Sequence, residues 1–299
     1  MDIDYIFPWV NPNDEHWRRL FYKYRRPDDL FDCRFRDFGL LKYVFRGIAA
    51  NMPWINKVHI ILAQDTQLPP WLNTDHVNVI YHSDYIPKEF LPTYNSHTIE
   101  SYLGNIQGLS EYLIYGNDDV YPVSPSNPED WFSSDGKPKI RYMVSNEAPG
   151  TFKQFCKKNF DDISDALRIN HDDGYYMRPS HYSTPLTLTA IRETFNILKD
   201  HIKTGITRFR NFNTNYSFYV FVDYILLKKQ NEPVSDKDTF GKCMTMLNNT
   251  EAREIANFVK TTTTRVLCIN DTEKTDMSNI QVLVKAFQEK FPNKCKYER

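Results

Sequence analysis

One stretch, residues 91–121, constrains the fold of this 299-residue chain more than any other. Apolar side chains recur at helical spacing over residues 99–106, and a continuous apolar and aromatic run follows at 112–115. The pattern predicts a helix that leads into a short buried strand. That strand ends directly before a glycine, an asparagine and two carboxylates, Asp118 and Asp119.

Two carboxylates at the end of a strand indicate one of two structures. Successive strand residues point to opposite faces, so Asp118 and Asp119 converge on one point only if the chain turns, and Gly116 would permit such a turn. Carboxylate oxygens suit a divalent cation, and Mg²⁺ is usually held by one or two carboxylates and a substrate's phosphates. Alternatively, Asn117, Asp118 and Asp119 form an ordinary turn, because Asn and Asp favour turns through local hydrogen bonds.

Composition excludes several classes of function. The formal net charge of −1 provides no broad positive field, which argues against nucleic-acid binding. The aromatic share of 15% would suit the stacking of sugars, although aromatic residues also fill a core. Five scattered cysteines without CxxC spacing indicate a reducing compartment and argue against a disulfide framework or a cysteine zinc site.

The chain shows no signal-peptide pattern at its acidic N-terminus and no apolar run long enough to span a bilayer. We therefore expect a cytoplasmic protein, and peripheral association with the inner face of the cell membrane stays open.

Strand and helix patterns alternate along the first part of the chain and predict an α/β fold with a largely parallel sheet. Strands are expected at 3–10, 57–63, 77–81, 112–115 and 265–269. Helices are expected at 14–26, 38–51, 95–106, 191–202, 216–229 and 278–291, the last with a capping box of Ser278 and Gln281. Residues 122–177 show no sustained period, so we expect an insertion or lid between two parts of one core, 1–121 and 178–299.

Ligands of parallel α/β sheets bind beyond the carboxyl ends of the strands. This rule predicts a common rim that carries polar residues following several strands, namely Asn11, Asp14, His82, Asn117, Asp118 and Asp119.

Four separated blocks carry a family resemblance. The second is the most specific, and reads RFRDFGLLKYVFRGIAANMPWINKVHIILAQDTQLPPWLN followed by LPTYNSHTIESYLGNIQGLSEYLIYGNDD. The others are Trp9-Val10-Asn11 with Asp14, His181 with Arg208 and Arg210, and Asn270-Asp271. Together they resemble the four conserved regions of the Stealth family, the sugar-1-phosphate transferases that build bacterial capsular polysaccharides and include the animal N-acetylglucosamine-1-phosphotransferase.

The resemblance implies a Rossmann-like core with flanking helices. It also implies transfer of hexose-1-phosphate or N-acetylhexosamine-1-phosphate from a UDP-sugar to a hydroxyl of a saccharide or polysaccharide acceptor. The products would be a phosphodiester and UMP. Such a reaction needs a cation, Mg²⁺ or Mn²⁺, to neutralise the diphosphate.

The resemblance also implies roles for individual residues. We expect Asp118, Asp119, His181 and Arg210 to be catalytic, with Arg210 clamping phosphate oxygens and His181 or a carboxylate acting as base. The expected metal ligands are Asp118, Asp119 and Asp271. The expected substrate-binding residues are Trp9, Asn11, Asp14, Arg34, Asp37, Arg46, Asn95, Ser96, Glu100, Asn117 and Arg208.

Two other functions remain open at this stage. A metal-dependent glycosyltransferase would use the Asn117-Asp118-Asp119 sequence to hold a nucleotide-sugar cation and would release UDP. A non-catalytic saccharide-binding protein would fit the aromatic content.

Overall fold

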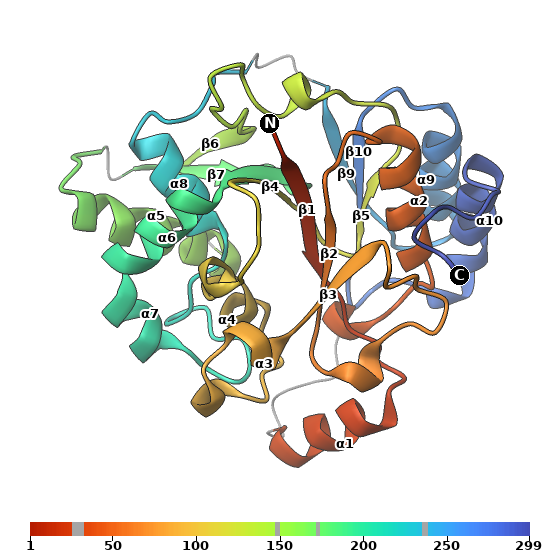
Figure 1. Ribbon diagram of the computed structural model, residues 1–299, viewed down its shortest axis with the longest axis horizontal. Helices are drawn as coiled ribbons and strands as arrows, with labels where there is room; N and C mark the ends of the chain where they lie inside the picture. The colour runs from red at the N-terminus through yellow and green to blue at the C-terminus, as the bar shows by residue number, and fades with distance from the viewer. Residues whose placement is uncertain (26–32, 147–149, 172–173, 235–238) are drawn as a thin grey trace.

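A five-stranded sheet runs through the centre of the computed structural model, which describes residues 1–25, 33–146, 150–171, 174–234 and 239–299 (Figure 1). Its strand order is β3-β2-β1-β4-β8, and the first four strands are parallel while β8 runs antiparallel to β4. The strands are β1 (Ile3–Pro8), β2 (Val58–Leu62), β3 (Val77–Tyr81), β4 (Tyr112–Tyr115) and β8 (Thr184–Thr187). The predicted α/β class with a mostly parallel sheet is confirmed.

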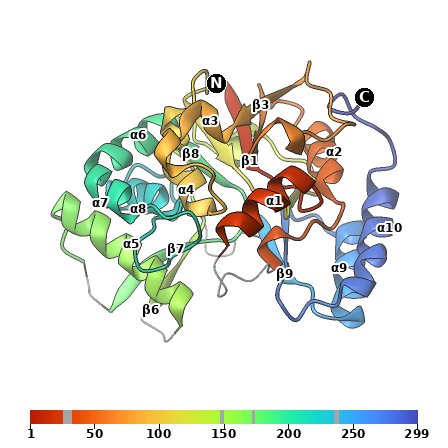
Figure 2. The ribbon, with the colours of Figure 1, turned by 90° about the horizontal axis from the view of Figure 1, so that it is seen from below.

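The central sheet is buried on both faces, as is usual for parallel sheets with helical connections. Because β1 side chains alternate between faces, Tyr5 and Phe7 join one apolar cluster and Ile6 joins another. The first cluster includes residues of α2 (Leu41–Asn51), α9 (Asn249–Thr261) and α10 (Ile280–Lys290). The second includes residues of α5 (Thr151–Leu167), α6 (Leu188–Ile197) and α8 (Tyr219–Leu227). Figures 1 and 2 show these two groups of helices on opposite sides of the molecule.

A second sheet of three strands, in the order β5-β10-β9, lies beside the first cluster. It consists of β5 (Val120–Pro122), β10 (Val266–Asn270) and β9 (Gly241–Thr245), with β10 parallel to β9 and antiparallel to β5. Since β5 begins shortly after β4 ends, the Asn117-Asp118-Asp119 segment joins the two sheets. The Ile269 backbone N–H donates to the Asp119 carbonyl at 2.9 Å, which ties this segment to β10.

Residues 122–177 are more regular than the sequence suggested. They contain the 17-residue helix α5 and strand β6 (Tyr142–Asn146). Strand β6 pairs antiparallel with β7 (Tyr175–Pro179), which begins within this segment. Phe155, Phe160 and Ile163 of α5 are buried in the second cluster. The prediction that this segment lacks a sustained pattern is wrong, and its role as a lid stays a prediction.

Several predicted boundaries also differ from the structure. The helix expected over 95–106 is α4 (Ser96–Ser101) followed by a 3₁₀ turn, and the helix expected over 191–202 is split into α6 and α7 (Lys199–Gly205). Asp276 rather than Ser278 caps the turn before α10. The first helix is α1 (Glu15–Tyr24), and its predicted end at Arg26 lies outside the described residues. Strands β8 and β9 and helix α9 were not predicted.

Gly116 has a different role from the one expected. Its φ angle is not positive, so the backbone here has a conformation that other residues could also adopt. A Cβ atom at this position would instead overlap the hydroxyl end of the Tyr5 side chain. Gly116 therefore allows β4 and β1 to pack closely beneath the Asp118-Asp119 segment.

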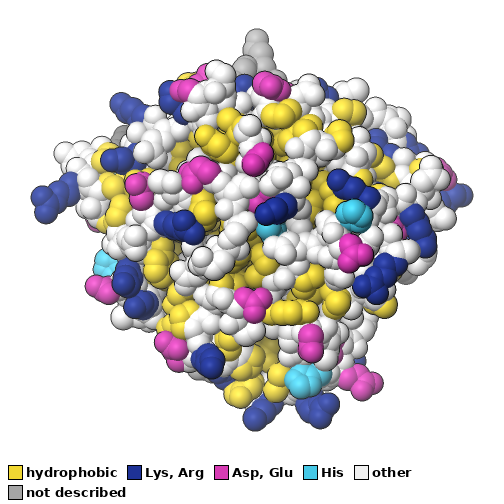
Figure 3. All heavy atoms as spheres, viewed as in Figure 1, with side chains coloured by type: hydrophobic (Ala, Val, Ile, Leu, Met, Phe, Trp, Pro, Cys, Tyr) yellow, Lys and Arg dark blue, Asp and Glu magenta, His cyan; other side chains and the backbone are white. Residues whose placement is uncertain are grey.

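The surface carries no field of a single sign on the face drawn in Figure 3, where acidic and basic side chains are interspersed. Among the described residues, no helix combines the length and the apolar composition needed to cross a bilayer.

Candidate active site

Strands β1, β4 and β10 end at one cavity of about 530 Å³. Trp9 follows β1, Asp118 and Asp119 follow β4, and Asp271 follows β10, so three strands from distant parts of the chain supply its wall. This is the edge of a parallel sheet at which ligands of α/β proteins bind.

Most of the residues predicted from sequence line this cavity, including His181 and Arg210 from segments far downstream of the carboxylates. The lining contains Trp9, Arg34, Asp37, Ser96, Glu100, Asn117, Asp118, Asp119, His181, Arg210 and Asp271. His82, which the rim argument named, lines it too. These residues, distant in sequence, therefore line one cavity, and their catalytic roles stay a prediction.

Three carboxylates of the cavity wall, Asp37, Asp118 and Asp119, have raised pKa values. Burial raises the pKa of Asp118 well above its ordinary value, and the charges of Asp119 and Asp37 raise it further. Burial also raises the pKa values of Asp119 and Asp37. The Asp119 Oδ1 atom is buried and has no hydrogen-bond partner among the described residues. A divalent cation would relieve both the repulsion and the unsatisfied oxygen, so this donor set fits Mg²⁺ or Mn²⁺.

Arg210, in the loop before α8, also lines the cavity. Its Nη2 atom donates to the Ser96 hydroxyl at 2.5 Å. Ser96 is the first residue of α4, so Arg210 and the start of that helix are held together at the cavity wall. A guanidinium with several N–H donors suits the oxygens of a phosphate.

Glu100 lies on α4 within the same wall and is buried. Its Oε2 accepts from the Phe218 backbone N–H at 2.9 Å, and its Oε1 accepts from the Tyr115 hydroxyl at 3.3 Å. Burial outweighs these hydrogen bonds and the charge of Arg210, and raises the pKa of Glu100 to about 7. This side chain therefore changes its charge near neutral pH.

Asp271 is paired with a residue that the sequence analysis did not single out. Arg36 Nε lies 2.8 Å from Asp271 Oδ2, and Arg36 Nη2 donates to Asp271 Oδ1 at 3.0 Å. Both oxygens of Asp271 therefore contact a guanidinium, which is a physical reason against the predicted metal ligation by this residue. Arg36 lies in the RFRDFG sequence of the second block, between the predicted substrate-binding residues Arg34 and Asp37. Nothing in the sequence indicated that it pairs with Asp271.

A comparison with protein families matches residues 34–140 to the model described as Stealth protein CR2, conserved region 2. Residues 34–140 are therefore a conserved region of the Stealth family. The matched region contains α2, β2, β3, α4 and β4, and so includes the carboxylates after β4. The resemblance stated from the second sequence block is confirmed.

Relatives of this protein have names that describe phosphotransferases. The chain is 29% identical to the exopolysaccharide phosphotransferase cps2G of Lactiplantibacillus plantarum, and the match covers 100% of this chain and 96% of that protein. It is 32% identical to the capsular polysaccharide phosphotransferase LcbA of Aeromonas hydrophila over 71% of this chain and 62% of that protein. Among solved structures, the galactosyltransferase LgtC aligns over 97% of this chain and 96% of that chain, with 12% identity and a TM-score of 0.44.

Two of the arginines expected to bind substrate contact other parts of the protein instead. Arg46 on α2 donates from Nε and Nη2 to Glu298 at 2.7 and 2.8 Å, and so anchors the C-terminal segment. The guanidinium of Arg208 lies 3.9 Å from the centre of the Tyr24 ring, and its Nε donates to the Pro92 carbonyl at 2.8 Å. Neither side chain lines the cavity.

Three polar residues expected to bind substrate have local structural roles. The Asn95 side chain accepts from the His97 backbone N–H and caps α4. Asp14 caps α1, and its Oδ2 accepts from Thr66 and Gln67. The Asn11 side chain accepts from the backbone N–H two residues later. These three residues also lie outside the cavity lining, because their short polar side chains satisfy nearby backbone groups.

The cavity also contains aromatic residues that the sequence analysis did not name. Tyr94 and His97 line it, and so does Phe152 at the start of α5. The His97 ring stacks on Phe155 with 4.7 Å between centroids. The Trp9 Nε1 and Tyr94 hydroxyl atoms are buried and have no hydrogen-bond partner among the described residues. Aromatic spacing gave no signal that could separate these residues from ordinary core.

Proposed function

We propose that this protein transfers hexose-1-phosphate or N-acetylhexosamine-1-phosphate from a UDP-sugar to a hydroxyl of a polysaccharide acceptor. The names of its relatives support the class of polysaccharide phosphotransferase. The observation that carries the proposal is the cavity in which Asp118 and Asp119 share a wall with His181 and Arg210.

In the proposed reaction, the acceptor oxygen attacks the β-phosphorus of the UDP-sugar. The bond from this phosphorus to the oxygen that bridges the two phosphates breaks, and that oxygen leaves with UMP. The hydroxyl proton passes to a base of the protein. The sugar keeps its bond to the transferred phosphate, so the new linkage is a phosphodiester.

His181 is our choice of base. Its contact with Cys243 and the charge of Asp119 raise the pKa of His181 above its ordinary value of 6.5, although partial desolvation of the ring by the surrounding residues opposes this. A raised pKa strengthens the imidazole as a base once it has lost its proton. The rate should therefore fall with decreasing pH along a limb whose midpoint lies above 6.5, because protonated His181 cannot accept the proton.

Arg210 is placed to hold the equatorial oxygens of the phosphate under attack. Trp9 Nε1 and the Tyr94 hydroxyl are unpartnered buried donors, and polar groups of the donor substrate would satisfy them. A bound Mg²⁺ or Mn²⁺, held by Asp118 and Asp119, would neutralise charge on the diphosphate.

One incubation separates this proposal from its alternatives. The protein is incubated with a panel of UDP-sugars, a saccharide acceptor and Mg²⁺, and the released nucleotide and the product are identified by mass spectrometry and phosphorus NMR. The proposal expects UMP and a phosphodiester. Release of UDP with no phosphorus in the product would establish a glycosyltransferase, and glycan binding without any nucleotide release would establish a binding protein.

Single substitutions test the assigned groups. Asp119→Asn and His181→Ala should each lower kcat by about 100-fold or more, which is typical for groups that act on developing charge or transfer a proton. Asp75→Asn, at an exposed position outside the cavity lining, is the matched control and should keep the wild-type rate. A wild-type rate in Asp119→Asn or His181→Ala would remove that residue from the mechanism.

A further inference from the structure

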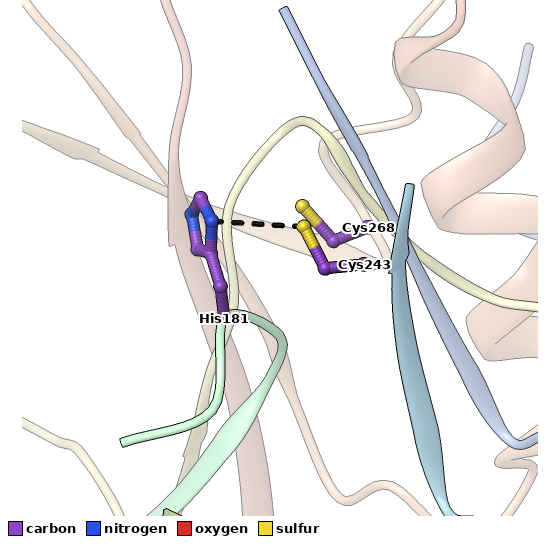
Figure 4. Close-up of side chains that lie close together, drawn as sticks. All are labelled: His181, Cys243 and Cys268. Atoms are coloured by element: carbon purple, nitrogen blue, oxygen red, sulfur yellow. Dashed lines mark hydrogen bonds between the residues drawn. The ribbon is translucent and has the colours of Figure 1, made fainter. Parts of the chain in front are cut away.

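A group of softer ligands lies beside the carboxylates of the cavity. His181, Cys243 and Cys268 each present a nitrogen or sulfur atom, and these atoms all lie within 4.8 Å of one another (Figure 4). The His181 Nδ1 atom is 3.9 Å from the Cys243 sulfur, which the dashed line in Figure 4 marks. The three side chains therefore point toward a common centre.

The fold explains how residues so far apart in sequence meet. Cys243 on β9 and Cys268 on β10 are direct partners in the parallel register of the second sheet. His181 lies in the connection between β7 and β8 and approaches the two sulfurs from the other side (Figure 4). Cys268 is buried, whereas His181 and Cys243 are exposed. One ligand is therefore held within the protein core, and the other two can be reached from solvent.

We propose that His181, Cys243 and Cys268 bind a zinc ion. Two thiolates and an imidazole are donors that zinc accepts in tetrahedral sites, with Zn–S near 2.3 Å and Zn–N near 2.0–2.1 Å. Such bond lengths put neighbouring ligand atoms roughly 3.5–4 Å apart, so the three atoms need to move inward by about 1 Å or less.

The fourth position of this site has a candidate ligand in the same wall. Asp119 Oδ2 lies 3.7 Å from the Cys268 sulfur. Zinc binds both cysteines as thiolates, so each sulfur that still carries a proton, Cys268 above all, releases it to solvent, and the two thiolates balance the charge of the ion. The contacts of Cys243 with Cys268 and His181 hold the pKa of the Cys243 thiol below its ordinary value, although burial opposes this, which favours its ionised form.

The zinc site differs in chemistry from the Asp37-Asp118-Asp119 cluster. Oxygen donors select Mg²⁺ or Mn²⁺, whereas thiolates and imidazole select zinc. On the proposed function, zinc would engage the base His181, so it should inhibit transfer that Mg²⁺ supports. This last consequence depends on that function, but the binding of zinc itself does not.

The first experiment measures the metal alone and needs no activity. The metal-free chain, kept reduced, is titrated with Co²⁺, which gives a sulfur-to-metal charge-transfer band when thiolates coordinate it. Zn²⁺ is then added to displace the cobalt, and its affinity is measured by competition with a chromophoric zinc chelator. We expect a charge-transfer band that saturates at one equivalent of thiolate-bound cobalt, and loss of that band when zinc is added.

Variants give the decisive comparison. Cys243→Ser changes an exposed residue and should lower zinc affinity by about tenfold or more, and His181→Ala should do the same. Cys295→Ser, which changes a cysteine outside the group, is the matched control and should bind zinc like the wild type. The proposal is overturned if cobalt gives no charge-transfer band, or if Cys243→Ser and His181→Ala, both folded by circular dichroism, bind zinc as tightly as the wild type.

Zinc inhibition of sugar-phosphate transfer is the second readout. Wild-type turnover with Mg²⁺ in excess should fall as zinc is added, and the Cys243→Ser variant should need about tenfold more zinc for the same effect. If the chain transfers no sugar-phosphate, the proposed function fails while the cobalt titration still decides the zinc site.

Discussion

The charge of Glu100 makes a quantitative prediction about stability. Its pKa rises from an ordinary 4.5 to about 7 in the folded protein, mainly because the carboxyl is buried. Between these two pH values the folded state binds more protons than the unfolded state, so the free energy of unfolding falls as pH rises. The interval is about 2.5 pH units, and at about 1.4 kcal/mol per unit the loss amounts to roughly 3 kcal/mol.

The Glu100→Gln variant isolates this contribution, because glutamine resembles the protonated acid and does not titrate. Urea unfolding of both proteins is followed by tryptophan fluorescence at intervals from pH 5 to pH 8. The stability of the wild type relative to Glu100→Gln should fall by about 2–3 kcal/mol over this range, since the unfolded Glu100 is already partly ionised at pH 5. Other titrating groups cancel in the difference between the two proteins, apart from those coupled to Glu100.

The control for this comparison is Glu129→Gln, in a side chain outside the cavity lining. Its stability relative to the wild type should stay constant with pH. If the difference between wild type and Glu100→Gln is equally constant, Glu100 is charged in the folded protein at all these pH values and the reasoning from its burial is refuted.

Two further substitutions test the packing around the cavity, both by urea unfolding. Gly116→Ala should destabilise the protein by about 1–3 kcal/mol, because the added methyl overlaps the Tyr5 hydroxyl. Tyr5→Phe in the same chain should restore part of this loss, whereas additive effects of the two substitutions would contradict this account. Arg36→Met should lower the free energy of unfolding by about 2 kcal/mol, because it leaves the Asp271 carboxylate without its partner. The loss should be smaller in an Asp271→Asn background, and equal losses in the two backgrounds would show that the ion pair contributes nothing to stability.

The elements that sequence identified correctly are those whose local pattern and burial agree. Strand β3 runs from Val77 to Tyr81 as predicted, since apolar residues alternate with less buried ones at this edge of the sheet. Strand β4 ends immediately before Gly116, because its continuous apolar run matches a strand that is buried along most of its length. The carboxylates after β4 were found for the same reason. Their meeting with His181 and Arg210 came from the family resemblance, since no local rule relates residues so far apart.

The elements that sequence missed depend on partners that it does not show. Helix α5 carries a polar, charged outer side, and its buried Phe155, Phe160 and Ile163 become a stripe only when α8 is known to lie against them. Strand β9 is exposed at the edge of its sheet, so Cys243 and its neighbours lack the apolar run of a buried strand. The sequence also did not show that Arg46 pairs with Glu298 or that Asp271 pairs with Arg36, because these partners are distant in sequence.

The same limit applies to the argument that scattered cysteines disfavour a zinc site. Spacing rules such as CxxC describe ligands held by one local turn. Here the register of two parallel strands sets Cys243 opposite Cys268, and a third segment adds His181, so the ligands meet through tertiary structure alone. Asp119 belongs to the carboxylates of the cavity wall and also lies beside the sulfur ligands, with Oδ2 near the Cys268 sulfur and Oδ1 buried without a hydrogen-bond partner among the described residues. The Asp119 side chain thus lies beside both oxygen donors and the nitrogen and sulfur donors of the proposed zinc site. We therefore expect the proposed transfer reaction to proceed with Mg²⁺ and to be inhibited by zinc.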